Sequence, residues 1–316
     1  MRHLGRSVLL AAILCALVAT GCTSGVGSSG PDNTPVRNDP AFTPDKLRAV
    51  DPCGLLDHDT LHPQGSPAGS SATGFVGTPS GFDNCGIDMK TFHHSDLVVS
   101  VMVGAEAART TGTRIVLSGM AVMEEFIVDE CDEEILTPDP KIGIMMQAQI
   151  HDAPCAVARD ITTAMINHIR TDPPKRQHPP GSVGLIDPCD TVDAPTAAAA
   201  VGPSARKTRV TLYNCRWDAG PLELSVAFDV GDARVPFRGQ ATPQPIDLGG
   251  VAGYEVMSDQ RSCEVGWNER PAAGAPHQFE VVYVDFGTLG QQPLDDTCAK
   301  TLAAARSVLT KVPKPS

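Results

Sequence analysis

Four runs of apolar and β-branched residues predict the strands of this chain. Residues 97–103 and 222–228 are alternating or continuous runs of this kind, and both are bounded by turn-forming residues. Residues 142–150 and 279–286 predict further strands on the same grounds. The four runs fall into two groups along the chain, which is the first indication of an internal repeat.

Helical patterns flank each group of strands. Short amphipathic helices are predicted at 55–61 and 191–201, each behind an Asp-Pro pair that supplies capping and first-turn chemistry. Longer helical patterns cover 155–169 and 298–309 and close each group. Because the strands cluster between helices instead of alternating with them, we expect an α+β fold with mainly antiparallel sheets.

The cysteines show the same duplication. The first cysteine of each set follows Asp-Pro, and the second follows Asn and opens a strand pattern. The third comes after a Gly-x-Ala phrase, and the fourth opens a helical pattern. Four landmarks in the same order predict two tandem copies of one unit. The two sets are Cys53, Cys85, Cys131 and Cys155, then Cys189, Cys215, Cys263 and Cys298.

We therefore predict two tandem α+β domains, each with an N-terminal and a C-terminal helix. The first domain, or first half, covers residues 48–171, and the second half covers residues 183–313. Residues 172–182 join them and hold four prolines, which forbid helix and central strand and favour an extended, semi-rigid spacer.

The N-terminal segment carries an export signal. Residues 1–21 combine a positively charged start with an apolar run over 8–19 that is too short for a permanent membrane helix. Small residues then precede Cys22, which resembles the lipobox of bacterial lipoproteins and makes Cys22 the predicted lipidation site. The alternative is an ordinary signal peptide that leaves Cys22 free. Residues 22–47 are predicted to be a flexible tether, because they offer almost no apolar residue to bury.

Charge and composition exclude some partners. The formal net charge of −12 over 316 residues disfavours nucleic acid, and an aromatic content of 4% leaves few stacking surfaces for sugars or bases. We expect no nucleic acid partner and a membrane contact through the N-terminal lipid anchor alone. The expected location is extracytoplasmic, at the cell membrane.

An even, repeated set of cysteines in an exported protein predicts disulfides. Zinc is the alternative, but the chain has no Cys-x-x-Cys pair or close Cys/His cluster. Four cysteines permit three pairings, so the sequence leaves the connectivity open. Closure within each half, first to second and third to fourth, would form loops worth roughly 3 to 4 kcal/mol each.

The Asp-Pro-Cys openings, Trp217 two residues after Cys215, and the Gly-x-Ala phrases together resemble the domain of unknown function 3558 family of actinobacterial secreted lipoproteins. The resemblance covers both halves and is closer in the second, since Ile87 stands where the family's Trp would fall. It implies a disulfide-bonded lipoprotein with no established activity. The overall plan is also similar to extracytoplasmic sensor domains of mycobacterial kinases, which suggests ligand sensing by analogy.

The common catalytic and cofactor motifs are absent from the sequence, so we expect no enzyme, no cofactor and no metal. Two patterns could still bind a cation. His58 and His62 lie four residues apart between carboxylates, but we favour an exposed polar face over a metal-binding pair, and His93-His94 is expected in a solvated turn. An acidic run surrounds Cys131, for which we favour a solvated face over weak calcium or basic-partner binding. Trp217 and Trp267 are expected to pack against disulfides.

Two functions from different classes remain. The first is a noncatalytic ligand-binding or sensor-like envelope lipoprotein, with a cleft between helix and sheet or between the domains as the site. The second is a structural or partner-docking subunit of an envelope assembly. An unrecognised hydrolase is a third and less favoured hypothesis.

Overall fold

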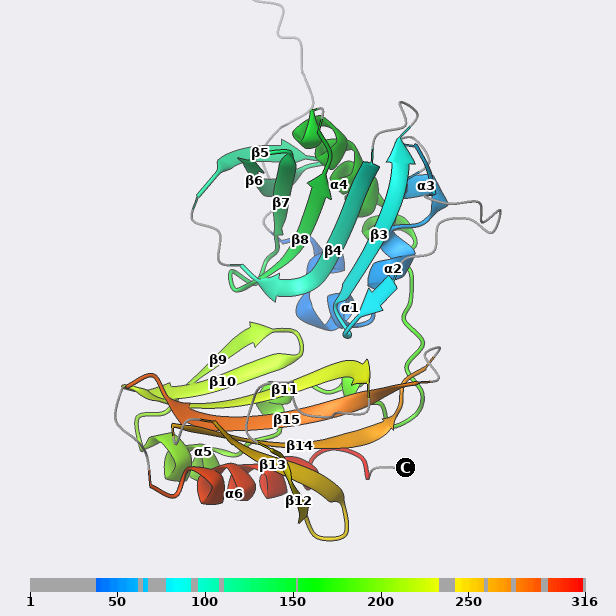
Figure 1. Cartoon of the computed structure of the whole chain (residues 1–316). Coiled ribbons are helices and arrows are strands. Elements are labelled where there is room, and N and C mark those ends of the chain that lie inside the picture. The colour runs from blue at the N-terminus through cyan, green and yellow to red at the C-terminus, as the bar shows by residue number, and fades with distance from the viewer. Residues whose placement is uncertain are drawn as a thin grey trace, which may run out of the picture. The chain divides into compact units, whose positions relative to one another are not determined.

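The computed structural model describes most of the chain after the predicted tether (Figure 1). The signal segment, Cys22 and most of the tether lie outside the described residues. Among the residues described, no helix is both long and apolar enough to cross a membrane. The described residues are 38–61, 65–67, 78–91, 96–107, 111–151, 153–232, 242–258, 261–273, 277–290 and 295–314.

The first half forms an antiparallel sheet in the order β1-β3-β4-β8-β7-β6-β5, with β2 also paired to β3. Short helices precede the sheet and the long helix α4 follows it (Figure 1). The strands are β1 (Gly65–Pro67), β2 (Thr78–Ser80), β3 (Asn84–Thr91), β4 (Asp96–Glu106), β5 (Thr113–Leu117), β6 (Met120–Ile127), β7 (Glu130–Leu136) and β8 (Ile142–Gln149). The helices are η1 (Pro40–Phe42), α1 (Pro44–Arg48), α2 (Pro52–Leu55), α3 (His58–Leu61) and α4 (Pro154–Thr171).

The second half forms an antiparallel sheet in the order β12-β13-β14-β15-β11-β10-β9. Its strands are β9 (Arg206–Thr211), β10 (Asn214–Ala219), β11 (Leu222–Asp232), β12 (Gln244–Asp247), β13 (Ala252–Ser258), β14 (Ser262–Pro271) and β15 (Gln278–Thr288). Its helices are η3 (Val183–Leu185), η4 (Pro188–Asp190), α5 (Ala194–Val201) and α6 (Thr297–Leu309).

The two sheets place corresponding strands in the same order. Starting from the strand that holds the second cysteine, the first half runs β3-β4-β8-β7-β6-β5 and the second runs β10-β11-β15-β14-β13-β12. The predicted strands at 97–103, 142–150, 222–228 and 279–286 fall in β4, β8, β11 and β15. The structure thus has two antiparallel sheets with a few helices, an α+β arrangement, and the shared order supports the duplication.

Alternation along β4 shows how the sequence builds the core of the first half. Leu97, Val99 and Val101 are buried on one face, whereas Val98 between them is exposed. Successive side chains of a strand point to opposite faces, so the buried face is the one that meets the helices. Helix α4 covers β7 and β8 on this side with an apolar stripe that includes Ile161.

Four disulfides, two in each half, join the sheets to their helices. All four lie within one half, first cysteine to second and third to fourth. They close sequence separations of 32, 24, 26 and 35 residues, which is the connectivity considered above. Such bonds persist in oxidising compartments and are therefore typical of extracytoplasmic proteins. The bonds are Cys53–Cys85, Cys131–Cys155, Cys189–Cys215 and Cys263–Cys298.

The predicted tether extends too far toward the first half. Residues from Pro40 to Arg48 form η1 and α1, and both Phe42 and Leu47 are fully buried. Asp39 caps η1 by accepting a hydrogen bond from the Ala41 amide at 3.0 Å. The composition of the segment is mostly polar, so composition alone predicted a flexible tether. Burial of the two apolar side chains nevertheless stabilises the packing of this segment against the core.

The proline-rich segment 172–182 is packed against the first half. The Asp51 amide donates to the carbonyl of Pro174 at 2.8 Å, and the Arg176 amide donates to the carbonyl of Ala49 at 3.0 Å. Val50 and Lys175 pair as an isolated bridge. The segment is therefore held by backbone hydrogen bonds in addition to its proline content.

The two halves also contact one another. The Tyr213 hydroxyl donates to the Arg48 carbonyl at 3.0 Å, the Arg48 guanidinium donates to the carbonyl of Leu212 at 3.0 Å, and the rings of Tyr213 and Phe82 stack with centroids 5.0 Å apart. Buried apolar residues of both halves belong to one contiguous cluster, and the described residues of the two halves form a single compact unit. The two-domain boundaries therefore remain a prediction.

Candidate functional site

A cavity of about 370 Å³ lies where α1, the end of α4 and the proline-rich segment meet. We call it the basic pocket. Its uncharged lining is apolar, and three cations complete it: Lys46, Arg170 and Lys175. Its volume lies within the range of small-molecule sites. The apolar lining residues are Pro40, Ala41, Ala49, Val50, Ile169 and Pro173.

Arg170 fixes one wall of the basic pocket. Its Nε donates to Asp39 at 2.7 Å, and one terminal nitrogen donates to the carbonyl of Ser118. The guanidinium also lies over the Phe42 ring, 5.9 Å from its centroid. These contacts hold the start of the described chain against the last turn of α4, so Arg170 shapes the pocket and is already paired.

The two lysines differ from Arg170. Lys46 and Lys175 are exposed, and within the described part of the chain neither forms an ion pair. They are thus two available cations at the edge of an apolar cavity, in a chain whose net charge is −12. Such a combination favours an anion that also carries apolar surface.

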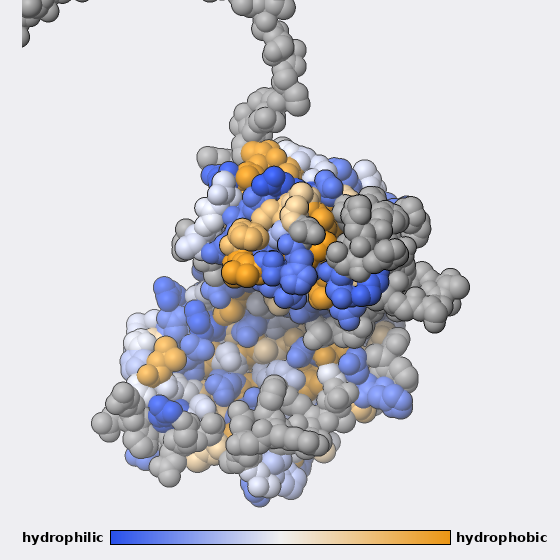
Figure 2. Space-filling model, turned by 45° about the horizontal axis from the view of Figure 1, so that its top comes forward, coloured by the Kyte–Doolittle hydropathy of each residue, from blue (hydrophilic) through white to orange (hydrophobic). Residues whose placement is uncertain are grey.

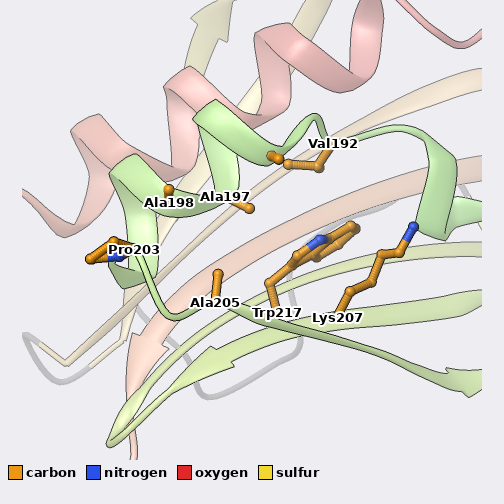
Figure 3. A pocket seen from close by; sticks show the side chains of 8 residues that line it. Val192, Ala197, Ala198, Pro203, Ala205, Lys207 and Trp217 are labelled. Carbon is orange, nitrogen blue, oxygen red and sulfur yellow. The ribbon is translucent and has the colours of Figure 1, made fainter.

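A second cavity, of about 210 Å³, lies between α5 and the sheet of the second half (Figure 3). We call it the indole pocket, because Trp217 of β10 and Lys207 of β9 line it on the sheet side. Small side chains line the rest, mostly alanines of α5 and the following loop. They are Val192, Ala194, Ala197, Ala198, Pro203 and Ala205.

The acidic run around Cys131 is not a solvated face, which corrects the prediction. It forms β7, paired on one edge with β6 and on the other with β8. Asp132, Glu133 and Glu134 are all buried. In a run of charged residues, the alternation of apolar and polar positions that indicates a strand cannot be seen. The matching residues of the second half, Cys263-Glu264-Val265, do show this alternation. Comparing the two halves could therefore have predicted the strand.

Glu133 lies beneath α4, fully buried and directly opposite Glu124 of β6. Arg159 of α4 holds Glu124 with two hydrogen bonds of 2.6 Å, but neither oxygen of Glu133 has a hydrogen-bond partner in the described structure. Burial, and after it the charge of Glu124, raises the pKa of Glu133 to about 7, against the opposing effects of Thr162 and Arg159. This carboxyl therefore titrates near neutrality.

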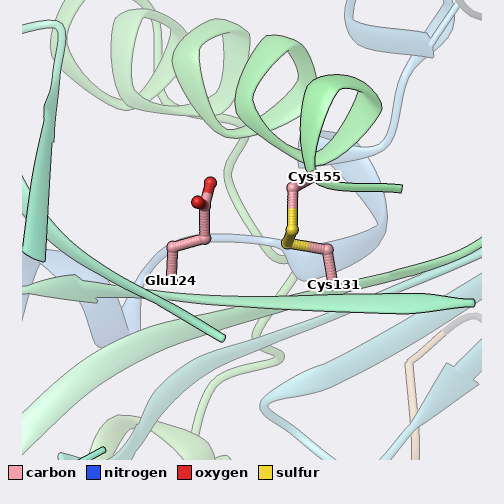
Figure 4. A group of neighbouring side chains, drawn as sticks. All are labelled: Glu124, Cys131 and Cys155. Atoms are coloured by element: carbon pink, nitrogen blue, oxygen red, sulfur yellow. A yellow bond between two sulfur atoms is a disulfide. The ribbon is translucent and has the colours of Figure 1, made fainter. Parts of the chain in front are cut away.

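A carboxylate lies beside the third-to-fourth disulfide in both halves. Glu124 has an oxygen within 4.8 Å of the sulfurs of Cys131 and Cys155 (Figure 4), and Glu255 stands in the same relation to Cys263 and Cys298. Metal ions bind cysteine as the thiolate. With the sulfurs joined as disulfides, each group offers one carboxylate and does not form a metal site.

The histidine pattern is only partly within the described structure. Asp57 caps α3 by accepting a hydrogen bond from the Thr60 amide at 2.9 Å, and it lies 3.7 Å from His168 of α4. This contact gives Asp57 a structural role. The side chain of His58, and the residues His62, His93 and His94, lie outside what the structure describes, so their proposed roles stay untested.

The two tryptophans have different surroundings. The indole N–H of Trp267 donates to Glu269 at 2.9 Å, whereas Trp217 lines the indole pocket. The predicted packing of both against disulfides remains a prediction. The sequence signal for the pocket was the run of alanines in α5, which we interpreted only as a helix.

An apolar hairpin joins β6 to β7. Phe126, Ile127 and Val128 are consecutive and 64%, 46% and 81% exposed. Carboxylates flank the three residues in the sequence, at Glu125 and Asp129. Apolar residues gather at several places on the face seen in Figure 2, set among hydrophilic ones. Exposed apolar surface of this kind is typical of contacts with other molecules.

Comparisons with known proteins leave the family undetermined. No family model matches the chain, and no curated protein matches it. A search of solved structures returns the crystal structure of MucB in complex with MucA(peri), at a TM-score of 0.16 and 11% identity, covering 80% of this chain and 98% of that one. A TM-score this low carries no argument about fold or function.

Proposed function

We propose that this chain is a noncatalytic, extracytoplasmic binding lipoprotein, anchored through Cys22 and built from two disulfide-bonded domains. Its ligand is an anion with an apolar body, held in the basic pocket. The observation that carries the proposal is the pairing of an apolar cavity of about 370 Å³ with two lysines that have no ion-pair partner in the described part of the chain.

The lining of the basic pocket indicates what each group of residues would do. The apolar residues would remove the body of the ligand from water, at roughly 25 cal/mol for each Å² buried. Lys46 and Lys175, which are both exposed, would meet the anionic group at the opening. Arg170, already bound to Asp39, would hold the wall in place.

A titration with 1-anilinonaphthalene-8-sulfonate tests this proposal, because that probe combines a sulfonate with an apolar ring system. The protein is the full exported chain with Cys22→Ala, so that no acyl chain of its own competes for the pocket. Exposed lysine-to-anion contacts contribute about 0.5 to 1 kcal/mol each. The double variant Lys46→Gln with Lys175→Gln should therefore weaken binding about tenfold.

Two controls make the result specific. Lys141→Gln removes an exposed lysine that does not line the pocket and should leave the affinity unchanged. Displacement of the probe by dodecanoate but not by dodecylamine at equal concentration would support an anionic ligand. Equal displacement by both, or unchanged affinity in the double variant, would overturn the assignment.

The exposed hairpin supports partner docking as a second candidate function. Phe126 and Val128 are the most exposed of its three apolar residues. Replacing both by serine should leave the fold intact but reduce crosslinking of the anchored chain to envelope proteins in intact cells. An unchanged crosslinking pattern would remove this candidate.

A further inference from the structure

We infer that the indole pocket is a second binding site, specific for a short-chain carboxylate. The first observation concerns the indole N–H of Trp217. Trp217 is only 3% exposed, and its indole N–H has no acceptor among the described residues. This nitrogen is not among the fully buried atoms that lack a partner, so water or a ligand in the pocket can reach it.

The second observation is the placement of Lys207. It stands directly opposite Trp217 in the pairing of β9 with β10, so both side chains rise from the same part of the sheet. The ring of Trp217 extends toward α5, with its nitrogen on the edge nearer the helix, and the Lys207 amine lies beyond it (Figure 3). An N–H and an ammonium on neighbouring strands can share one carboxylate.

Lys207 keeps the capacity for this contact. Its Nζ donates to the carbonyl of Cys189 at 3.2 Å and lies 3.8 Å from Asp190, which is largely exposed. The first contact uses one of three protons and positions the amine at the pocket. Since the pair with Asp190 is long and solvent-facing, a carboxylate in the pocket can compete with it.

The third observation comes from the duplication. Leu61 and Ala197 each lie eight residues after the first cysteine of their half, and Ile87 and Trp217 each lie two residues after the second. The first half buries Leu61 completely, whereas the second has alanine there and a cavity of about 210 Å³. At the corresponding sequence positions the first half is therefore packed with apolar side chains, whereas the second half has a cavity beside an indole N–H donor.

The volume and lining of the indole pocket limit the size and chemistry of the ligand. Its volume admits an acceptor group and an apolar body of a few carbon atoms, because the remaining walls are methyl groups and proline carbons. An anionic acceptor suits both donors better than a neutral one. A ligand of about six heavy atoms reaches an affinity of roughly 1 mM, so the test must work at weak binding.

The two indole N–H signals of the protein provide that test. The full exported chain with Cys22→Ala is titrated with sodium butanoate, and the indole ¹⁵N–¹H resonances are followed by NMR. Trp217→Phe assigns the signals. We expect the Trp217 resonance to shift with saturation, while that of Trp267, already bonded to Glu269, stays in place as an internal reference.

Matched variants decide the details. Ala198→Leu fills the pocket and should abolish the shift, whereas Ala199→Leu on the exposed side of α5 should not. Lys207→Gln should weaken butanoate at least fivefold and change the affinity for butanamide much less. A Trp217 resonance that does not move, that moves together with Trp267, or that still shifts in Ala198→Leu would overturn the inference.

The inference is independent of the basic pocket. Lys46→Gln with Lys175→Gln should leave the butanoate-induced shift unchanged, since those lysines line the other cavity. Loss of the shift in that double variant would contradict a separate site. If the sulfonate probe did not bind in the basic pocket, the butanoate-induced shift of Trp217 would still be expected.

Discussion

Replacing Glu133 by glutamine should remove a pH-dependent loss of stability. The side chain is fully buried under α4, faces Glu124, and has no hydrogen-bond partner for either oxygen in the described structure. Arg159 is the nearby cation, but it is already bound to Glu124 through two hydrogen bonds. The charged form of Glu133 is therefore buried without adequate compensation.

The direction of the effect follows from the pKa. Burial raises the pKa of Glu133 from 4.5 to about 7 in the folded protein, so the folded state holds this proton more tightly than the unfolded state. The stability associated with the proton is complete below about pH 4.5 and is lost as pH rises through about 7. A pKa change of this size corresponds to about 3 kcal/mol, of which more than about 2 kcal/mol falls between pH 5 and pH 8.

Glutamine keeps the shape of the protonated carboxyl and cannot ionise. Its amide carries N–H donors that can reach out to Glu124 or Thr162 without placing a charge in the core. We expect Glu133→Gln to match the parent at pH 5 and to exceed it by about 2 kcal/mol at pH 8 in the free energy of unfolding. Urea denaturation at both pH values, with disulfides intact, measures the difference.

The difference between parent and variant cancels the contribution of the other buried acids to the pH dependence of stability. Asp285 has its pKa raised to about 7, chiefly by burial and then by Glu264 and Glu223, so the parent alone would show a mixed response. Glu106→Gln, at an exposed end of β4, is the control and should leave the pH dependence unchanged. A Glu133→Gln variant with the pH dependence of the parent, or one less stable than the parent at pH 8, would refute the reasoning.

Three further predictions follow from the anchor, the disulfides and the segment before α1. Cys22→Ala should release the protein from membranes without unfolding it, and a variant that still fractionates with membranes would contradict lipidation. Mass spectrometry of nonreduced peptides should find no bridge between the halves; one such bridge would defeat the connectivity. Arg170→Ala should cost about 2 kcal/mol, because it leaves the buried side of Asp39 unpaired, and should expose the start of η1 to limited proteolysis, whereas an equally protected variant would show that Arg170 does not hold it.

The sequence by itself determined the repeat and the class of fold. Matching positions of Cys53 and Cys189, and of the cysteines after them, are properties of the chain that need no structure to be seen. Alternating apolar residues in β4 likewise specify which face is buried, because the side-chain period of a strand is a local property. These features arise within one segment at a time.

Only the tertiary structure determined that the acidic strand β7 is buried. A run of carboxylates such as Asp132 to Glu134 is predicted to be solvated from its sequence alone. In the structure α4 and the neighbouring strands cover it, and the local sequence carries no signal of this burial. The same holds for the end of the tether, where burial of Phe42 and Leu47 depends on partners far along the chain. Burial is a property of assembled surfaces, so composition alone misjudged both segments.

The two pockets have the same origin. Lys46 is more than a hundred residues from Arg170 and Lys175 in the sequence, and the three cations meet because α1, α4 and the proline-rich segment pack together. Trp217 and Lys207 become neighbours through strand pairing, and the space above them exists because α5 carries alanines there. A cavity is the volume that several segments leave unfilled, and no single segment of sequence contains that information.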